Sequence, residues 1–368
     1  MTVPDPSAKA IPPQWALRTP LYDLHAELHG YTTGRWKDGM QVPAYYGSIV
    51  REHHVLRESV GLVDLGKRGL FRLSGPAAAS ILERLLTARI SQMEVGQWTR
   101  IPFVGADGLM VDFARVGKED EQTWIVFLAN AVVHEAFEML KAEALHRDCE
   151  LDDISSQYAW MGIVGPRAHA FVGEWTRGGE VLAPGRLGEF LAAGVACTLW
   201  RESDNYYELF CQPELLIKAA REGLSCPSSP EFCGWAAFEN WRLEEGRLRH
   251  GFEIKEGISP FDLGLDSLVD LDREGLLART ALAEQSRHGS KYMLVYFSLD
   301  AMRLPRKGQA LYSSEKLAGR VAAGGFGLVL NRPIGVAWVL VEGVDFDTLE
   351  IEIHRQRYPI KIRKPPLI

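Results

Sequence analysis

The sequence has no run of about 20 apolar residues, the length that a helix needs to cross the hydrocarbon core of a bilayer. We therefore expect no membrane-spanning helix. Residues 1–13 are polar and rich in proline, without the apolar stretch of a signal peptide, and we expect a mobile lead-in there. The five cysteines form no C-x-x-C pair, which excludes the common zinc and redox spacings. Unpaired thiols in a reducing cytoplasm are the expectation.

Clusters of basic residues are also missing. Lys and Arg are dispersed along the chain and the net charge is −7, so we expect neither nucleic acid nor a membrane surface as a partner. The chain lacks the phosphate loop G-x-x-x-x-G-K-[ST], the nucleophile elbow G-x-S-x-G and the zinc helix H-E-x-x-H. His53 and His54 point in different directions on an expected helix, and no third ligand has usable spacing, so we expect no metal site.

The hydrophobic pattern that is present indicates an α+β protein with two or three domains, because 368 residues exceed one ordinary core. Helical spacing occurs in residues 18–29, 47–58, 131–144 and 235–249, and a loop is expected at 221–234. Period-two alternation is typical of strands, and it occurs in 61–73 (as a strand pair), 98–104, 109–116, 123–128, 158–164, 195–200 and 206–211. The last 75 residues predict an all-β domain with turns at Gly324-Gly325 and Asn331-Arg332-Pro333.

Short motifs spread over residues 18–366 follow one another in an order and spacing that resemble one known family. They are T-P-L-Y-D-L-H (19–25), V-P-A-Y-Y-G-S (42–48), E-H-H-V-L-R (52–57), G-L-V-D-L-G (61–66), L-S-G-P-A-A (73–78), D-G-L-M-V-D (107–112), V-G-P-R-A (164–168), R-L-E-E-G (242–246), I-S-P (258–260) and R-K-P-P-L (363–367). Taken singly, none is specific. As an ordered set they resemble the tetrahydrofolate-dependent aminomethyltransferase family, the T-protein of the glycine cleavage system, with this chain as a divergent member.

The resemblance implies a three-domain cloverleaf of antiparallel sheets flanked by helices, with a central folate channel. It implies a discontinuous α+β first domain of residues 1–49 plus 146–285. Residues 50–145 would form a ferredoxin-like α+β second domain, and residues 286–368 a C-terminal β-barrel or sandwich. It also implies tetrahydrofolate as the cofactor and a small-molecule one-carbon donor.

The same resemblance implies two catalytic residues. Asp112 matches the family's acidic residue beside the folate nitrogen that receives the one-carbon unit, where a carboxylate stabilises developing positive charge. An ordinary strand-end aspartate is the alternative. Tyr46 matches a tyrosine that the family places on the substrate side of the channel, and a packed core aromatic is the alternative there.

Four further positions match residues that hold the cofactor. Asn130 matches an asparagine that lines the pterin slot, and Asp204 stands where the family has a pterin-gripping glutamate. Glu208, like Glu202, is a neighbour that can substitute for Asp204. Arg242 belongs to a matched motif, but its helix is rich in charge, so an ion-pair face is the alternative.

The departures from the family fall on the ligand channel. Phe238 stands where the family has an arginine that contacts the folate tail, and the family's G-Y-T-G-E is absent as such. These changes argue against docking of a lipoyl carrier protein. Ile101-Pro-Phe-Val is similar to a segment of the sulfoniopropionate demethylases. Three functions fit: an aminomethyltransferase-like enzyme, a tetrahydrofolate-dependent O- or S-demethylase of the vanillate/syringate or sulfoniopropionate type, and a folate-binding protein without turnover.

Overall fold

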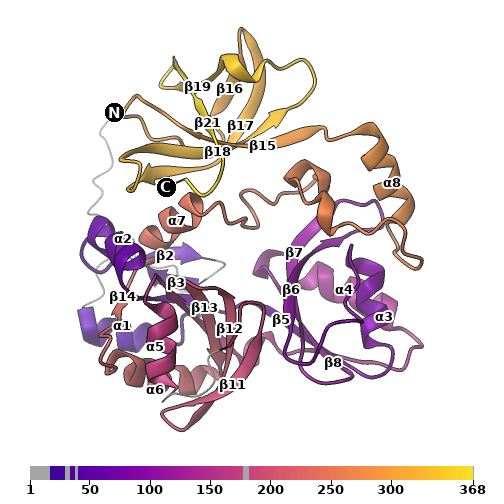
Figure 1. The fold of residues 1–368 in the computed structure, drawn as a ribbon, viewed down its shortest axis with the longest axis vertical. Helices are drawn as coiled ribbons and strands as arrows, with labels where there is room; N and C mark the ends of the chain where they lie inside the picture. Colours follow the sequence, from indigo (N-terminus) through magenta and orange to yellow (C-terminus); the bar gives the residue numbers. More distant parts are fainter. Residues whose placement is uncertain (1–16, 30–33, 38–39, 177–181, 368) are drawn as a thin grey trace. The chain divides into compact units, whose positions relative to one another are not determined.

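A computed structural model describes residues 17–29, 34–37, 40–176 and 182–367 of the chain, which divide into two compact units (Figure 1). The first unit combines Met1–Lys67 with Ser156–Phe238, and the second combines Arg68–Ser155 with Glu239–Ile368. Each unit is thus built from two separate stretches of sequence. The expected lead-in 1–13 lies outside the described residues, and the expected division into three domains stays a prediction.

A six-stranded sheet forms the centre of the first unit, in the order β11-β12-β13-β10-β4-β14. Neighbouring strands are antiparallel except β14, which runs parallel to β4. The strands are β4 (Gly61–Gly66), β10 (Ala159–Val164), β11 (Leu187–Ala192), β12 (Val195–Ser203), β13 (Tyr206–Cys211) and β14 (Glu231–Phe232). A small second sheet contains β1 (Leu17–Arg18), β2 (Gly34–Lys37) and β3 (Met40–Pro43).

Helices cover one face of the six-stranded sheet. The helices of the first unit are α1 (Tyr22–His29), α2 (Ile49–Glu58), α5 (Ala168–Trp175) and α6 (Pro213–Leu224), and the turn η2 (Ser155–Gln157) precedes β10. Phe171 of α5 and Leu216 of α6 pack with Ile163 and Leu209 of the sheet in one buried core, and α5 and α6 lie beside this sheet in Figure 1. Each such side chain contributes roughly 1.5–3 kcal/mol when fully buried.

The second unit begins with a five-stranded antiparallel sheet in the order β6-β7-β8-β5-β9. Its elements are β5 (Gly69–Ser74), α3 (Ala78–Leu85), β6 (Trp98–Val104), β7 (Met110–Lys118), β8 (Thr123–Leu128), η1 (Asn130–Val132), α4 (Val133–Ala144) and β9 (Glu150–Asp153). Ile81 and Leu85 of α3 and Leu140 of α4 pack with Phe103 and Val126 of the sheet in a buried core.

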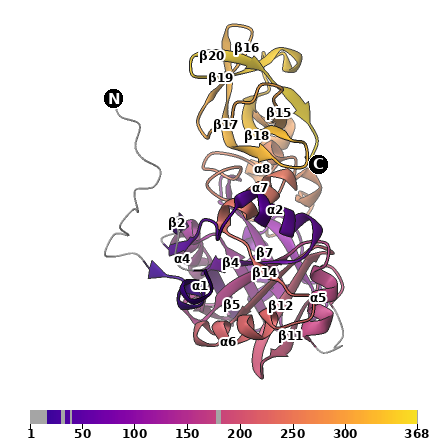
Figure 2. The ribbon, with the colours of Figure 1, turned by 90° about the vertical axis from the view of Figure 1, so that its left-hand side faces the viewer.

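A seven-stranded antiparallel sheet completes the second unit, in the order β20-β19-β16-β17-β18-β15-β21 (Figure 2). Its strands are β15 (Tyr292–Ser298), β16 (Ala310–Ser313), β17 (Lys316–Gly327), β18 (Arg332–Leu340), β19 (Leu349–Ile353), β20 (Gln356–Pro359) and β21 (Lys361–Arg363). The helical elements before and within it are α7 (Trp235–Glu244), η3 (Phe261–Leu263), η4 (Asp266–Leu268), α8 (Arg279–His288) and η5 (Phe346–Thr348). The boundary between the units falls inside α7, after Phe238.

Some local predictions were wrong. Residues 61–73 do form two strands, but β4 pairs with β10 and β5 pairs with β8, so they are not a hairpin. The loop predicted from residue 221 begins later, because α6 continues to Leu224, and α7 ends at Glu244 instead of near residue 249.

Gly324-Gly325 is also not a turn, because both glycines lie inside β17. They are needed for close packing: a Cβ at Gly324 would meet the Pro305 carbonyl oxygen at 2.5 Å, and one at Gly325 would meet Asn240 Oδ1 at 2.5 Å.

The predicted α+β class, the antiparallel sheets with flanking helices and the all-β C-terminal part are confirmed. None of the described helices has the length and the apolar composition that a bilayer-crossing helix needs. The five cysteines are free in the structure.

Candidate functional site

Asp112 lies near the start of β7, beside an irregularity in the strand pairing. Phe103 of β6 pairs with Asp112, and the next pair shifts register so that Val111 is left over as a bulge. Bulges re-aim neighbouring side chains and are common next to active sites. The Asp112 side chain is 5% exposed, and its Oδ2 accepts a hydrogen bond from the Ala129 N–H at 2.7 Å. A buried carboxylate is therefore fixed in direction at the end of this sheet.

The electrostatic setting of Asp112 opposes its ionisation. Burial raises its pKa above the ordinary value for aspartate. The backbone N–H groups of Ala129 and Phe113 and the charges of His250 and Arg100 act in the opposite direction without cancelling the effect of burial. Among the described residues, the hydrogen bonds that stabilise its carboxylate come from the backbone. A cation that arrives beside Asp112 would therefore strongly stabilise the ionised form of its carboxyl group.

Asn130 is held next to this carboxylate. It directly follows Ala129, whose N–H binds Asp112, and it begins the short helix η1. Its carbonyl oxygen accepts from the Val133 N–H, and its side chain is partly exposed. The structure therefore brings two of the predicted site residues, Asp112 and Asn130, together.

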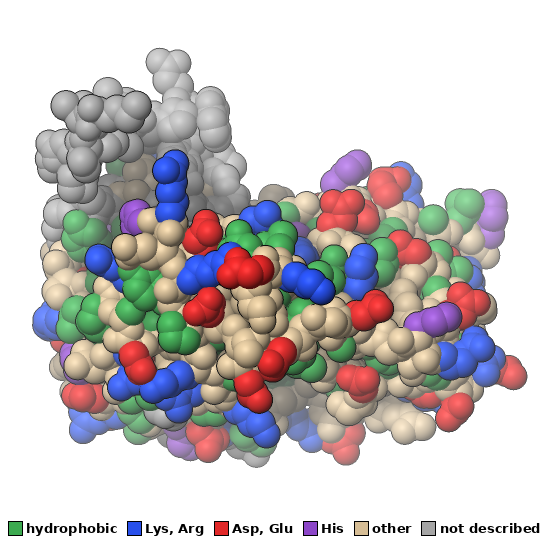
Figure 3. All heavy atoms as spheres, turned by 90° about the horizontal axis from the view of Figure 1, so that it is seen from above, with side chains coloured by type: hydrophobic (Ala, Val, Ile, Leu, Met, Phe, Trp, Pro, Cys, Tyr) green, Lys and Arg blue, Asp and Glu red, His purple; other side chains and the backbone are tan. Residues whose placement is uncertain are grey.

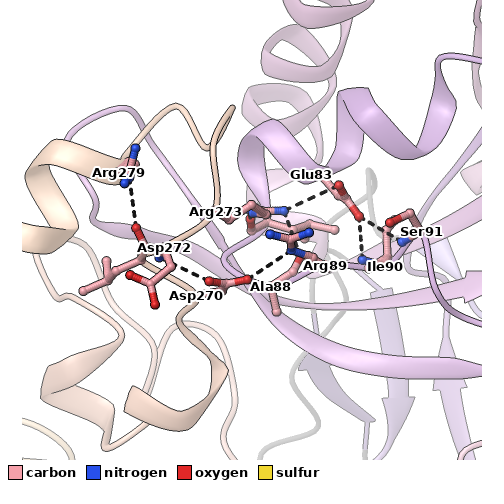
Figure 4. A network of polar contacts seen from close by, with 11 residues as sticks. Glu83, Ala88, Arg89, Ile90, Ser91, Asp270, Asp272, Arg273 and Arg279 are labelled. Atoms are coloured by element: carbon pink, nitrogen blue, oxygen red, sulfur yellow. Dashed lines mark hydrogen bonds and ion pairs between the residues drawn. The ribbon is translucent and has the colours of Figure 1, made fainter.

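The chain segments on both sides of η3 are tied to the part of the second unit that contains the five-stranded sheet. The Met110 N–H, two residues before Asp112, donates to the Ile258 carbonyl oxygen at 2.8 Å. Figure 4 shows Arg273 reaching α3 and the turn after it, where it pairs with Glu83 at 3.9 Å and donates to the Ala88 carbonyl oxygen at 3.2 Å. Asp270 pairs with Arg89 at 3.3 Å in the same network. The hydrogen bond of Met110 restricts the backbone that carries Asp112, and the other contacts hold residues 270–273 against α3 and the turn after it.

Glu208 lies on the face of the six-stranded sheet opposite to the α5–α6 core. It is 1% exposed, accepts a hydrogen bond from the Tyr206 hydroxyl and pairs across the ladder with Gly162 of β10. Tyr207, Leu209 and Cys211 point into the helical core, so the alternation of the strand puts Tyr206, Glu208 and Phe210 on the other face.

Aromatic rings lie beside Glu208 on the same face of the six-stranded sheet. Trp160 stacks on Phe210 with centroids 4.2 Å apart, and Trp200 lies edge-on to Trp160 at 6.3 Å. Phe238, which stands where an arginine was expected from the family pattern, packs against Tyr206 at 6.1 Å. A carboxylate among flat apolar rings has the chemistry to bind a planar heterocycle with N–H donors.

Asp204 has a different environment from Glu208. It lies at the turn between β12 and β13, its side chain is 87% exposed, and it forms an ion pair with Arg201 at 2.6 Å. Arg201 also donates to the Leu182 carbonyl oxygen at 2.6 Å. Of the two predicted acidic residues, Glu208 is buried and Asp204 is exposed at the turn.

Arg242 is neutralised by neighbours within the second unit. It is 5% exposed, and its guanidinium pairs with Glu253 at 2.9 Å and with Glu239 at 3.3 Å. It also donates to the Arg247 carbonyl oxygen. Despite burial, which acts in the other direction, these two carboxylates raise the pKa of Arg242 above its ordinary value. The ion-pair alternative considered for Arg242 describes this geometry.

Tyr46 takes part in a hydrogen-bonded chain in the first unit. Its hydroxyl lies 2.9 Å from Nδ1 of His25, and Nε2 of His25 lies 2.9 Å from Oδ2 of Asp64. His25 is 1% and Asp64 3% exposed, whereas Tyr46 is partly exposed. Tyr46 is thus more than a packed core aromatic.

Sequence reasoning missed His25, Tyr206 and the two tryptophans, and it noted Asp64 only as part of a motif. A signal was present for two of the acidic residues. Asp64 and Glu208 each interrupt an apolar run, G-L-V-D-L-G and Y-Y-E-L-F-C, and a charge in a buried strand must find a partner. His25, the side-chain partner of Asp64, comes from a segment 39 residues away and left no local trace, whereas Tyr206, the partner of Glu208, lies two residues away on the same strand.

Possible metal ligands and, on one face of the molecule, the distribution of charge are further features of the described residues. Among the described residues, no three His, Cys, Asp or Glu side chains are grouped as a metal ion would require. On the face drawn in Figure 3, basic and acidic side chains are interspersed.

Comparison with known families covers nearly the whole chain. The family model described as the GCVT N-terminal domain matches residues 21–273. The model described as the glycine cleavage T-protein C-terminal barrel domain matches residues 293–368.

Individual relatives match at low identity over their full length. The chain is 25% identical over 360 residues to an aminomethyltransferase of Bacillus subtilis, and the match covers 95% of this chain and 98% of the relative. It is 26% identical over 367 residues to an aminomethyltransferase of Bacillus licheniformis, with the same two coverages. Among solved structures, the glycine cleavage system aminomethyltransferase T from Bartonella henselae matches with a TM-score of 0.88, 21% identity and coverage of 96% and 98%.

Proposed function

The chain belongs to the glycine cleavage T-protein family, and on that basis we propose that it transfers an aminomethyl, methylene or methyl group from a small donor to tetrahydrofolate. The relatives it matches are aminomethyltransferases, which supports a one-carbon transferase. The 25% sequence identity to the Bacillus subtilis relative does not establish which donor this chain uses. In this proposal tetrahydrofolate accepts the group on a ring or side-chain nitrogen.

The observation that carries the proposal is the state of Asp112. Its charge is buried, fixed by the Ala129 N–H and held at a raised pKa. A carboxylate of this kind gains most when positive charge develops beside it, as happens on a nitrogen that is forming a bond to carbon. In the proposed role Asp112 stabilises that charge in the transition state, and Asn130 next to it helps to orient the ring.

The first unit supplies a set of residues that fits the flat part of the cofactor. Glu208 can accept hydrogen bonds from the amino and ring N–H groups of a pterin, and Trp160, Phe210 and Tyr206 offer apolar ring faces. In our proposal Glu208 therefore takes the pterin-binding role for which Asp204 was the first candidate. Arg242 is already paired with Glu239 and Glu253, so we assign it to the scaffold.

Two finer alternatives for the donor remain within this proposal. An O- or S-demethylase would take the methyl group of a methoxylated aromatic acid or of a sulfonium compound. An aminomethyltransferase of the glycine cleavage type would take the group from a lipoyl carrier protein. A folate-binding protein without turnover is the competing function.

One experiment separates these functions. Tetrahydrofolate is titrated into the protein by calorimetry, and the melting temperature is followed in parallel, because a ligand that binds the native state must stabilise it. The protein with bound tetrahydrofolate is then incubated with an aminomethylated lipoyl carrier, a sulfoniopropionate and vanillate in separate reactions. Mass spectrometry detects methylene- or methyl-tetrahydrofolate.

The expected result is heat, a raised melting temperature and one product with one class of donor. Binding without product from any donor supports the non-catalytic alternative. No heat and no thermal shift at about millimolar tetrahydrofolate, far above the usual dissociation constants of such sites, would contradict the proposal.

A further inference from the structure

The Tyr46–His25–Asp64 chain joins three separate segments of the first unit. His25 lies on α1 beside the buried Leu21 and Leu24, Asp64 lies in the middle of β4, and Tyr46 follows β3. Both ring nitrogens of His25 are engaged, one with each neighbour, at 2.9 Å. Of the three residues only Tyr46 is partly exposed, so Tyr46 is the end of the hydrogen-bonded chain that lies nearest to a ligand.

The hydrogen bonds of Asp64 set the direction of this chain. Oδ1 of Asp64 accepts from the Gly66 N–H at 2.8 Å, and Oδ2 faces Nε2 of His25. A carboxylate accepts only, so Nε2 of His25 carries a proton. In the neutral ring Nδ1 is then an acceptor, and the Tyr46 hydroxyl donates to it. This is the logic by which a buried carboxylate orients the imidazole of a hydrolase triad, with a phenol in place of the serine.

The backbone of Tyr46 is held as firmly as its hydroxyl. The buried Glu52 carboxylate accepts from the Tyr46 N–H at 2.8 Å and the Gly47 N–H at 3.0 Å with one oxygen, and from the Gly234 N–H at 2.8 Å with the other. Gly234 approaches so closely that a Cβ there would meet the Ala44 carbonyl oxygen at 2.5 Å.

Ring packing restricts the same group further. Phe232 packs edge-on against the His25 ring with centroids 4.9 Å apart, and it tilts against the Tyr46 ring at 6.1 Å. The tyrosine hydroxyl is therefore preorganised, with little freedom to lose when a ligand binds.

A second histidine–tyrosine pair in the first unit, His169 and Tyr207, can be compared with His25 and Tyr46. Nδ1 of His169 lies 2.7 Å from the Tyr207 hydroxyl, but His169 is exposed and Tyr207 is buried. Burial raises the pKa of Tyr207 to about 12. No described carboxylate is hydrogen-bonded to His169. This pair has the same two side chains in the inverse arrangement, so it serves as a matched control.

We propose that His25 and Asp64 make Tyr46 the proton-transfer group for the one-carbon transfer described above, an inference that rests on that proposed function. The Tyr46 oxygen takes the proton that a secondary amine must lose as its lone pair forms the new N–C bond. The Tyr46 hydroxyl proton passes to Nδ1 of His25 in the same step, and Asp64 stabilises the imidazolium. The electron pair of the broken bond stays with the donor's leaving group. As the hydrogen-bonded chain resets, the proton passes to the leaving group when that group is a phenolate or thiolate, and to solvent when it is a neutral thioether. Tyr46 touches the substrate, while His25 and Asp64 are positioning residues.

The test compares variants of the full chain in two measurements. The first is the single-turnover rate at saturating tetrahydrofolate, together with the dissociation constant of tetrahydrofolate. Tyr46→Phe and His25→Gln should each lower the rate by about a hundredfold, the lower end of what general acid–base catalysis contributes, with the dissociation constant changed less than about threefold. Tyr207→Phe and His169→Gln, the matched controls, should keep the rate within about threefold of the wild type.

The second measurement is independent of activity. Nitrogen-15 NMR should show His25 protonated at Nε2, with a Nδ1 resonance that shifts in Tyr46→Phe and stays in place in Tyr207→Phe. If His25→Gln does not fold, Tyr46→Phe decides, because it removes a single oxygen atom from a partly exposed residue.

Product formation by the wild type with unchanged rates in both Tyr46→Phe and His25→Gln would overturn the proton-transfer role alone. A His25 ring protonated at Nδ1 only would overturn it as well. A wild type that binds tetrahydrofolate but yields no product with any donor overturns the proposed function, and the proton-transfer role falls with it.

Discussion

Asp64 in the first unit and Asp112 in the second are both buried carboxylates on strands, yet their partners differ. Asp64 is 3% exposed and is bound by the ring of His25 and the Gly66 N–H. Asp112 is 5% exposed and accepts from backbone N–H groups, and burial raises its pKa. Asp64 thus has an ionisable partner, His25, at hydrogen-bond distance. Among the described residues Asp112 has no ionisable partner at that distance.

The difference separates two uses of a buried charge. A charge that already has a partner fixes other side chains in place, as Asp64 fixes His25 and as Glu239 and Glu253 fix Arg242. A carboxylate without a cation at hydrogen-bond distance keeps most of its interaction energy for a ligand. In our proposal Asp112 and Glu208 serve the ligand, although Glu208 also accepts from the Tyr206 hydroxyl, while Arg242 and Asp204 serve the fold.

The largest expected effect concerns Arg242. Arg242→Met leaves the fully buried Glu253 without its cation, while Glu239 keeps its pair with Arg249 at 3.0 Å, and the loss should lower the free energy of unfolding by about 3 kcal/mol. Urea denaturation measures this loss. The control is Arg332→Met, since Arg332 pairs with Asp300 at 2.8 Å with side chains 36% and 60% exposed, and such a surface pair is worth up to about 1 kcal/mol. Unchanged stability with loss of tetrahydrofolate binding would return Arg242 to the ligand site.

A smaller effect distinguishes the two acidic residues of the β12–β13 hairpin. Glu208→Gln removes a charged acceptor from the aromatic face of the sheet and should weaken tetrahydrofolate binding about tenfold or more, since a charge-assisted hydrogen bond contributes roughly 1.5–3 kcal/mol. Asp204→Asn removes an exposed ion pair and should change the dissociation constant less than about threefold. Calorimetry measures both variants, and the opposite ranking would make Asp204 the pterin-binding acid.

The smallest expected effect is a gain in stability. Because the pKa of Asp112 is raised in the folded chain, the folded carboxyl holds its proton to a higher pH than the unfolded one. The stability that the protonated group contributes is fully present below the pKa of the unfolded chain. It is lost as the pH rises through the pKa of the folded chain, so ionisation of Asp112 destabilises the folded protein. Asp112→Asn should therefore raise the melting temperature at pH 7.5, and thermal denaturation measures this gain. The gain should shrink as the pH is lowered, and a loss of stability at pH 7.5 would contradict this account.

Local pattern predicted the elements of this fold better than their partners. The strand at 98–104 has the predicted bounds, and the helices at 49–58 and 133–144 lie within their predicted ranges, because periodicity records which side chains face a core. Pairing is not local. Neighbouring strands β4 and β5 were expected to pair, but each joins a different sheet through a partner further along the chain. Gly324-Gly325 was predicted as a turn because paired glycines are common in turns. The close approach of Pro305 and Asn240, which explains the two glycines, leaves no sign in the sequence.

The candidate site was likewise predicted only in part from the sequence. Asp112 and Asn130 were found through motif order, and the structure shows them joined through Ala129. His25 was missed because a histidine on the apolar side of a helix is indistinguishable from a core residue until Asp64, 39 positions away, is seen beside it. The neutralised state of Arg242 likewise depends on Glu253, which packing brings to it.

The most direct test of this account is the transfer rate of Asp112→Asn at saturating tetrahydrofolate. Asparagine keeps the shape and the acceptor for the Ala129 N–H and removes only the charge. The account predicts that the single-turnover rate falls about a hundredfold or more while the dissociation constant of tetrahydrofolate changes less than about threefold. Full activity in the Asp112→Asn variant would contradict the assignment of Asp112 as the group that stabilises the transition state.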